Sequence, residues 1–321
     1  MLNRRLLRIK TFKVLFSAWP EGLDAYESVK KTLLLSCDKT VDLYYFLLNI
    51  CGSLQSLSLE KIEAAKNKYN PTKEELNPNL KFVSNKFFKF LSENAEFQKY
   101  CQRKGLTWGE NDIFVKKIYA SIVASDYYAE YMASDDDSLK AEYSFAMRIF
   151  EEEFEDNEML ESILEDLSVY WIDDVNYVLN NILYCIDGMI HGKEFVLPNT
   201  FIKDEDKFFT LNLLKLSLEH YKEYFDYICE QLQNWDSDRI VSTDATLIVM
   251  GLVEAMYFTN IPIKVTINEY VEISKFYSTD NSHTFINGML DKIIQEKFTS
   301  GTIVKSGRGL LDGGQRVSKS E

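Results

Sequence analysis

The stretch IPIKVTINEYVEISKFYSTDNSHTFINGMLDKIIQEK (261–297) decides the fold class, because it has the pattern of two helices joined by a polar turn. Tyr270, Ile273 and Tyr277 recur at three- and four-residue spacing, which places them on one face of a helix. The polar segment STDNS (278–282) ends that helix and supplies residues that can cap the next one. Free backbone N–H groups at the start of the second helix would make this junction a candidate anion site.

The start of the first of these two helices is predicted from a capping box. Thr266 and Glu269 have the required spacing, so we expect the helix to begin at about Ile267. The run IPIKVTI (261–267) resembles a strand, but it lies between helical patterns and carries a proline near its start. We therefore interpret it as a connecting loop.

The rest of the chain repeats the helical pattern, with apolar residues three and four positions apart between charged ones. Strand-like alternation is scarce, so the sequence predicts an all-α fold. The predicted helical segments are 3–19, 25–35, 39–68, 84–101, 112–132, 138–166, 172–190, 206–233, 238–257, 267–277 and 283–297.

Composition excludes several classes of protein. The 321 residues are 46% hydrophobic and include only five prolines, which fits a packed helical core. The five cysteines are scattered without a CxxC pair and indicate reduced thiols in a cytosolic protein. The three histidines stand at no metal-ligand spacing, and no nucleotide-binding or hydrolase motif occurs. We therefore expect no metal, no cofactor, no membrane span and no catalytic activity.

Charge is distributed unevenly along the chain. The formal net charge is −14, which would ordinarily argue against a nucleic-acid partner. Residues 134–174, however, hold fifteen acidic and two basic residues, whereas residues 1–19 hold five basic residues and no acid. The simplest interpretation of the acidic run is a solvated helix face. The alternative is a surface for a basic protein, such as a ribosomal protein or an RNA polymerase-associated factor.

Breaks in the helical pattern predict four parts. Two loop-like stretches, 70–79 and 191–201, contain prolines, and glycines become frequent from Gly301 onward. We expect an N-terminal helical region (1–69), an expanded acidic region (70–198), a C-terminal domain (199–298) and a flexible tail (299–321).

The first predicted helix combines arginines with aromatic residues. Arg4 and Arg8 are four residues apart and share a face, with Arg5 at its edge, and Phe12 and Phe16 continue the face. Guanidinium groups that lead into aromatic rings suit single-stranded nucleic acid. On residue types alone, a solvated basic helix end with both rings in the core is the simpler interpretation.

These segments resemble one known family. The string 261–297 resembles the C-terminal signature of the NusB family of transcription antitermination factors, which has a proline, a lysine–valine pair, an INE helix, a DS..F run and NG.LDK. The segment 234–258 resembles the family stretch that precedes it, and 3–19 resembles the arginine-rich first helix. The matching positions in 234–258 are Trp235, Asp238, Arg239, Ile240, Asp244 and Glu254.

The resemblance implies a function and a set of site residues. Members are all-α and bind single-stranded boxA RNA of nascent ribosomal RNA together with a small ribosomal protein, NusE. It places the NusE surface at about 211–258. By position, it implies RNA contacts from Arg4, Arg5, Arg8, Phe16, Lys275, Tyr277, Asn281, Ser282 and Phe285.

Three departures from the family pattern bear on this hypothesis. Phe16 stands where many members have tyrosine, so it keeps a stacking ring and loses a hydroxyl group. Asn281 stands where an acid is common, which removes a charge that would repel phosphate. The chain is also about twice the usual family length, as in long variants with an inserted helical region. The competing hypothesis is a helical protein–protein interaction module with a NusB-like fold and little RNA affinity.

Overall fold

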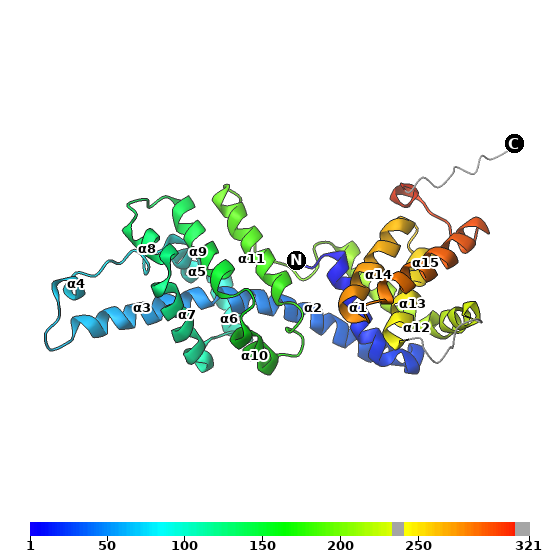
Figure 1. Cartoon of the computed structure of the whole chain (residues 1–321), viewed down its shortest axis with the longest axis horizontal. Helices are drawn as coiled ribbons and strands as arrows, with labels where there is room; N and C mark the ends of the chain where they lie inside the picture. Colours follow the sequence, from blue (N-terminus) through cyan, green and yellow to red (C-terminus); the bar gives the residue numbers. More distant parts are fainter. Residues whose placement is uncertain (233–240, 312–321) are drawn as a thin grey trace. The chain divides into compact units, whose positions relative to one another are not determined.

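The computed structural model describes residues 1–232 and 241–311 (Figure 1). Within these ranges the chain is helical, and the one β-type contact is an isolated bridge between Leu2 and Phe201. This confirms the predicted all-α fold. Trp235 and the run from Asp238 to Ile240 lie outside the described residues.

The chain divides into two compact units, each with its own core. Unit 1 comprises Met1 and Asp38–Thr200, and unit 2 comprises Leu2–Cys37 and the chain from Phe201 onward. The division at Thr200 lies near the predicted boundary at 198–199. The other division lies within a helix, between Cys37 and Asp38, and not at the predicted boundary of 69–70.

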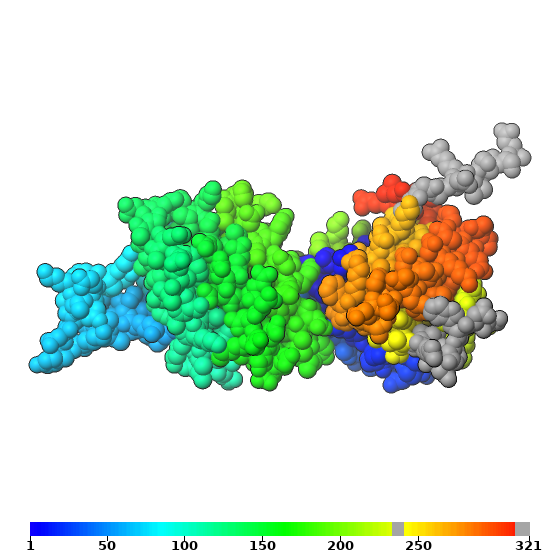
Figure 2. Space-filling view, viewed as in Figure 1, coloured from blue at the N-terminus to red at the C-terminus, as the bar shows by residue number. Residues whose placement is uncertain are grey.

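Unit 2 is built from helices at both ends of the sequence. Its elements are α1 (Arg4–Ala18), η1 (Trp19–Ala25), the first part of α2 (Tyr26–Leu48), α12 (Asp204–Gln231), α13 (Ser242–Tyr257), α14 (Ile263–Tyr277), α15 (Ser282–Thr299) and η4 (Gly307–Leu310). α13 lies at the centre, with every residue from Asp244 to Ala255 buried, and α1, α12, α14 and α15 pack against it. In Figure 2 the orange surface of α14 and α15 covers much of this side of unit 2, and little of α13 is visible.

Unit 1 contains the second part of α2 and the helices that follow it. These are α3 (Ile50–Lys66), α4 (Lys73–Leu76), α5 (Lys86–Glu93), α6 (Ala95–Lys104), η2 (Gly109–Asn111), α7 (Asp112–Ala124), α8 (Asp126–Ala133), α9 (Leu139–Glu153), α10 (Glu158–Leu167) and α11 (Val175–Ile190). Aromatic rings form much of its core. Trp108 stacks on Phe46 and Phe114, with ring centroids 4.2 and 5.1 Å away, and Trp171 stacks on the other side of this group.

α14 begins earlier than the sequence predicts. The helix starts at Ile263, with Pro262 as its N-cap residue, so the segment interpreted as a loop is the first turn of the helix. Proline is well tolerated there because the first N–H groups of a helix have no intrahelical partner. Thr266 does not cap the helix: its side chain donates a hydrogen bond to Glu254.

The C-terminal segment also differs from the prediction of a flexible tail. Residues 300–311 fold against the loop that follows α13, with Ile303 2% exposed. The remainder of the tail (312–321) lies outside the described residues. Among the described helices, none combines the length and the apolar character that crossing a bilayer requires.

Candidate nucleic-acid interface

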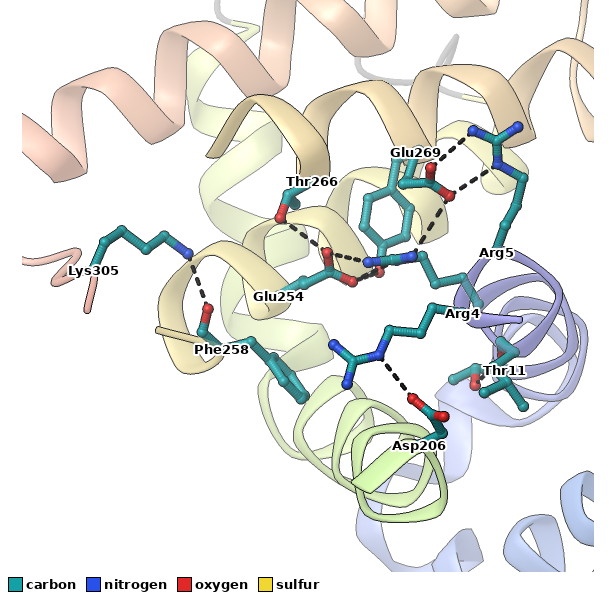
Figure 3. A network of polar contacts seen from close by, with 12 residues as sticks. Arg4, Arg5, Thr11, Asp206, Glu254, Phe258, Thr266, Glu269 and Lys305 are labelled. Atoms are coloured by element: carbon teal, nitrogen blue, oxygen red, sulfur yellow. Dashed lines mark hydrogen bonds and ion pairs between the residues drawn. The ribbon is translucent and has the colours of Figure 1, made fainter. Parts of the chain in front are cut away.

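Arg8 anchors α1 in the interior of unit 2. Its guanidinium donates two hydrogen bonds, of 2.7 and 2.8 Å, to the carboxylate of Glu254 on α13. Thr266 and Tyr270 of α14 donate to the same carboxylate at 2.9 and 3.1 Å (Figure 3). Burial lowers the pKa of Arg8, but the Glu254 carboxylate raises it by more, so the net shift is upward and the guanidinium stays charged.

This position differs from the expectation that Arg8 faces RNA. The Arg8 side chain is 3% exposed and the Glu254 side chain is fully buried. The resemblance identified an arginine-rich helix, but it could not show that one of the three arginines points inward. Arg8 therefore positions α1 against α13 and α14 and is not available as a surface contact.

Arg4 and Arg5 lie at the surface, and each has a carboxylate partner. Arg5 donates two hydrogen bonds to Glu269 of α14 at 2.9 and 2.8 Å, and its side chain is 49% exposed. Arg4 donates to Asp206 of α12 at 3.0 Å and is 37% exposed (Figure 3). Burial raises the pKa of Glu269, but Arg5 and Arg8 lower it by more, so its net shift is downward. Both exposed arginines are thus held in place and partly neutralised by acids of other helices.

Aromatic rings continue the contact between α1 and α14 beyond the arginines. The ring centroids of Phe12 and Tyr277 lie 5.8 Å apart, and Phe16 lies 6.1 Å from Phe12. Lys13 places its ammonium group 5.2 Å from the centre of the Tyr277 ring. Since Arg5 meets Glu269 and Phe12 meets Tyr277, the two helices run side by side in the same direction. Phe16 is 38% exposed and Tyr277 is half-buried, so the aromatic end of the contact between α1 and α14 also reaches the surface.

The turn between α14 and α15 is held by buried hydroxyl groups. Ser282 is 2% exposed and donates to the Asp244 carboxylate at 2.8 Å, and Ser278 donates to the other oxygen of Asp244. Ser282 therefore fixes the turn, which differs from the expectation of an RNA contact. Asn281 next to it is exposed and makes no side-chain capping bond to α15.

The remaining predicted site residues lie on the two helices that flank this turn. Lys275 is exposed on α14 and pairs with Glu272 at 2.5 Å. Phe285 is half-buried on α15. The structure thus brings the predicted residues of α1 and α14 together within unit 2. Two predicted residues face inward, Arg8 on α1 and Ser282 at the start of α15.

A hollow of about 550 Å³ lies where α1 and α14 begin. Arg4, Arg5, Arg8 and Glu269 line it together with Arg308, which comes from the C-terminal segment. The sequence marks the tail as mildly basic, but a glycine-rich segment gives no sign of where it folds. Arg308 is therefore a basic residue of the interface that the sequence did not assign.

The acidic excess belongs to unit 1. Residues 38–200 hold 29 acidic and 16 basic residues, so unit 2 is close to neutral. Some acids of the run 134–174 are internal, because Glu142 and Glu153 accept hydrogen bonds from Tyr131 and Tyr127 at 2.8 and 2.9 Å. Exposed acids line a separate hollow of about 630 Å³, among them Glu152, Glu155, Asp156 and Glu158. The acidic run is therefore partly structural and partly a surface.

Among the known proteins that this chain is similar to, three carry the name "Transcription antitermination protein NusB". The protein from Chloroherpeton thalassium is 34% identical over 118 residues, which are 36% of this chain and 56% of the relative. The protein from Salinibacter ruber is 36% identical over 111 residues, 34% of this chain and 69% of the relative. The protein from Methylacidiphilum infernorum is 36% identical over 95 residues, 30% of this chain and 66% of the relative.

The matched regions are partial on both sides. The chain spans little more than half the length of the Chloroherpeton protein. No solved structure matches the chain. A model of the NusB family matches residues 194–295, which include α12 to α14 and most of α15. With this match, and with more than two thirds of the Salinibacter protein covered, the chain belongs to the NusB family.

Proposed function

We propose that this chain is a non-catalytic transcription antitermination factor that binds single-stranded, boxA-type RNA of nascent ribosomal RNA. The names of its relatives support the antitermination role. One structural observation supports the RNA surface: α1 and α14 lie side by side in unit 2, so the exposed cations and the exposed ring of α1 form one row with Tyr277.

The row has the chemistry that an unpaired strand requires. Arg4, Arg5 and Lys275 offer cations for phosphates, and Phe16 and Tyr277 offer ring faces for bases. Asn281 and Phe285 extend the surface at the turn before α15 and in the helix itself. Arg8 and Ser282 are buried and would not contact RNA. They support the surface by fixing the positions of α1 and of the turn before α15.

Binding of RNA requires an exchange of partners. Arg5 donates both of its observed hydrogen bonds to Glu269, so a phosphate must compete with that carboxylate or bind the remaining N–H groups of the guanidinium. Half of the Arg5 side chain is exposed, which leaves it accessible to a strand. The exchange predicts a modest affinity for RNA alone.

A second protein would complement the surface. We propose that NusE, a small ribosomal protein, binds unit 2 in the region 211–258. α13 is buried along most of its length, so the contacts would come from the exposed side of α12. For unit 1 we propose that its exposed acids offer a surface to a basic protein, such as an RNA polymerase-associated factor.

The competing function is a protein–protein module with little affinity for RNA. The observation that favours it is the neutralisation of Arg4 and Arg5 by acids of the same unit. The two functions differ in how binding depends on salt, since each phosphate contact releases counterions.

The test is binding of the full-length chain to a fluorescently labelled, short single-stranded RNA over a range of salt concentrations, with and without NusE. We expect a log–log salt slope of about −0.7 per neutralised phosphate. Phe16→Ala is expected to weaken binding by about 1–3 kcal/mol, because a stacking ring is lost. Arg5→Ala is expected to weaken binding to every sequence and to make the salt slope shallower.

The controls are matched variants in unit 1. Arg148 is 45% exposed and paired with Glu130 and Glu152, so Arg148→Ala removes a similar ion-paired arginine. Tyr69 is 98% exposed, so Tyr69→Ala removes an aromatic ring from the surface. If Arg5→Ala and Phe16→Ala bind RNA as tightly as these controls, the RNA-binding proposal is wrong and the protein-module function stands.

A further inference from the structure

The segment that follows α15 forms a fixed strap over unit 2. We call residues 300–311 the C-terminal strap. The backbone N–H of Ser306 donates to the carbonyl of Thr259 at 2.9 Å, and the ammonium group of Lys305 donates to the carbonyl of Phe258 at 3.2 Å. Ile303 is 2% exposed. Apolar burial and hydrogen bonds to the α13–α14 loop therefore hold the strap in place.

Two glycines allow the strap to approach this loop closely. Gly307 has a φ of 52°, a conformation that side chains other than glycine rarely adopt. Gly309 lies so close to the carbonyl of Thr259 that a Cβ at this position would overlap the oxygen. Arg308 lies between these glycines, so the backbone geometry that they permit also fixes the point from which its side chain extends.

Arg308 differs from the other arginines of the hollow in its partners. Arg4, Arg5 and Arg8 each pair with a carboxylate of unit 2. Arg308 is exposed, and its side chain makes no hydrogen bond or ion pair with any residue that the structure describes. Among the described residues that line the hollow, three of the four arginines are therefore paired with acids, and Arg308 is the fourth. A negatively charged ligand would pair with Arg308 without displacing one of these acids.

The other walls of the hollow suit the rest of a nucleotide. Pro262 and Val265, from the beginning of α14, line it together with Ile261 and Leu311. The N-terminal end of α14 adds the positive end of a helix dipole next to the arginines. A volume of about 550 Å³ exceeds the need of a single phosphate group and leaves space for a sugar and a base.

We propose that this hollow binds a phosphate ester and that Arg308 of the C-terminal strap is its principal contact. The proposal rests on the proposed RNA-binding function and extends it, because it assigns one backbone phosphate of the bound strand to the hollow. Planar guanidinium groups bind phosphate oxygens through paired N–H donors, and the Arg308 guanidinium donates to none of residues 1–232 and 241–311. A free nucleoside monophosphate has the same chemistry and is the second possible source of the phosphate.

The test compares three variants of the full-length chain with the wild type. Arg308→Ala removes the cation and is expected to weaken binding to short single-stranded RNA about five-fold, with a salt slope shallower by about 0.7. Gly309→Ala keeps every charge but displaces the strap, and is expected to weaken binding similarly. Lys31→Ala removes an exposed cation of α2 in unit 2 that does not line the hollow, and is expected to bind RNA as the wild type does.

A second arm separates the two sources of phosphate. Calorimetric titration with adenosine monophosphate and with inorganic phosphate measures whether the hollow binds a free ester. Weaker RNA binding by Arg308→Ala supports the assignment of a backbone phosphate. Unchanged RNA binding with loss of adenosine monophosphate binding supports a phosphate site for free nucleotides.

The outcomes also separate this proposal from the proposed function. If Arg308→Ala changes the affinity for none of the three probes while Arg5→Ala and Phe16→Ala weaken RNA binding, the hollow is not a phosphate site and the RNA function stands. If all of these variants bind RNA as the wild type does, the RNA function itself fails. Thermal unfolding of each variant confirms that a loss of binding is not a loss of folding.

Discussion

A guanidinium group that is 3% exposed can keep its charge because a carboxylate lies against it. Arg8 and Glu254 form such a pair, and Thr266 and Tyr270 satisfy the remaining acceptor positions of the carboxylate. Removing both charges from a buried pair is often tolerated, whereas removing one leaves an uncompensated charge in the interior. The pair therefore couples the orientation of α1 to an acid in the interior of α13.

This dependence gives a prediction for Glu254→Gln. We expect the free energy of unfolding of unit 2 to fall by about 3 kcal/mol, since Arg8 is left buried with Glu269, 3.5 Å away, as its remaining counter-charge. Urea unfolding measures the change. The matched control is Glu27→Gln, which breaks an exposed pair with Lys30 and is expected to cost less than about 1 kcal/mol. Equal effects in the two variants would contradict the assignment of a buried clamp.

At the scale of elements, the contact between α1 and α14 depends on pH through Glu269. The arginines lower its pKa below the ordinary value of 4.5 in the folded state. A carboxylate whose pKa is lower in the folded state stabilises the fold above its unfolded pKa, and this stability disappears as the pH falls through the folded pKa. The contribution should therefore be complete at neutral pH and decline below about pH 4.5.

Glu269→Gln tests this linkage. At pH 7 we expect the variant to be less stable than the wild type by on the order of 1 kcal/mol. The difference should shrink as the pH falls from about 5 to 3, because the wild-type carboxylate becomes protonated there. Urea unfolding midpoints of both proteins across this range measure the effect. A difference that stays constant with pH would show that the Arg5–Glu269 contact does not act through charge.

The helices themselves were largely predictable from the spacing of apolar residues, and the errors have physical causes. The break predicted between 35 and 39 does not exist, because α2 contains neither proline nor glycine to end it. The capping box predicted from Thr266 and Glu269 does not form, because each side chain has a stronger long-range partner. Thr266 pairs with Glu254, and Glu269 pairs with Arg5. Local sequence gives the helical period, but it does not show which distant charge a side chain will meet.

The candidate site was predictable in part for the same reason. The resemblance identified α1 and the α14–α15 turn, and the structure brings α1 and α14 together. It could not separate Arg8 from Arg5, since the burial of Arg8 depends on an acid 246 positions away. Nor could it place Arg308, because its position depends on contacts between a glycine-rich segment and the loop after α13.

For the molecule as a whole, two separate cores predict two unfolding transitions. Trp108 is 1% exposed in unit 1, and its indole N–H donates to the carbonyl of Phe46 at 2.8 Å. We expect Trp108→Ala to destabilise unit 1 by about 3–5 kcal/mol and to leave unit 2 nearly unchanged. Differential scanning calorimetry resolves the transitions, and the fluorescence of Trp19, which stacks on Tyr221, serves as a reporter in unit 2. An equal shift of both transitions would show that the chain unfolds as one cooperative body.

The discontinuous make-up of unit 2 has a consequence for synthesis on the ribosome. α1 is translated first, but the carboxylate that neutralises Arg8 emerges 246 residues later. At about 5–20 residues per second, this delay is roughly 12–50 s. Within that time unit 1 is translated as far as Thr200, whereas α1 still lacks its counter-ion and its packing partner α13. The order of translation thus makes the first of the described helices one of the last to complete its native contacts.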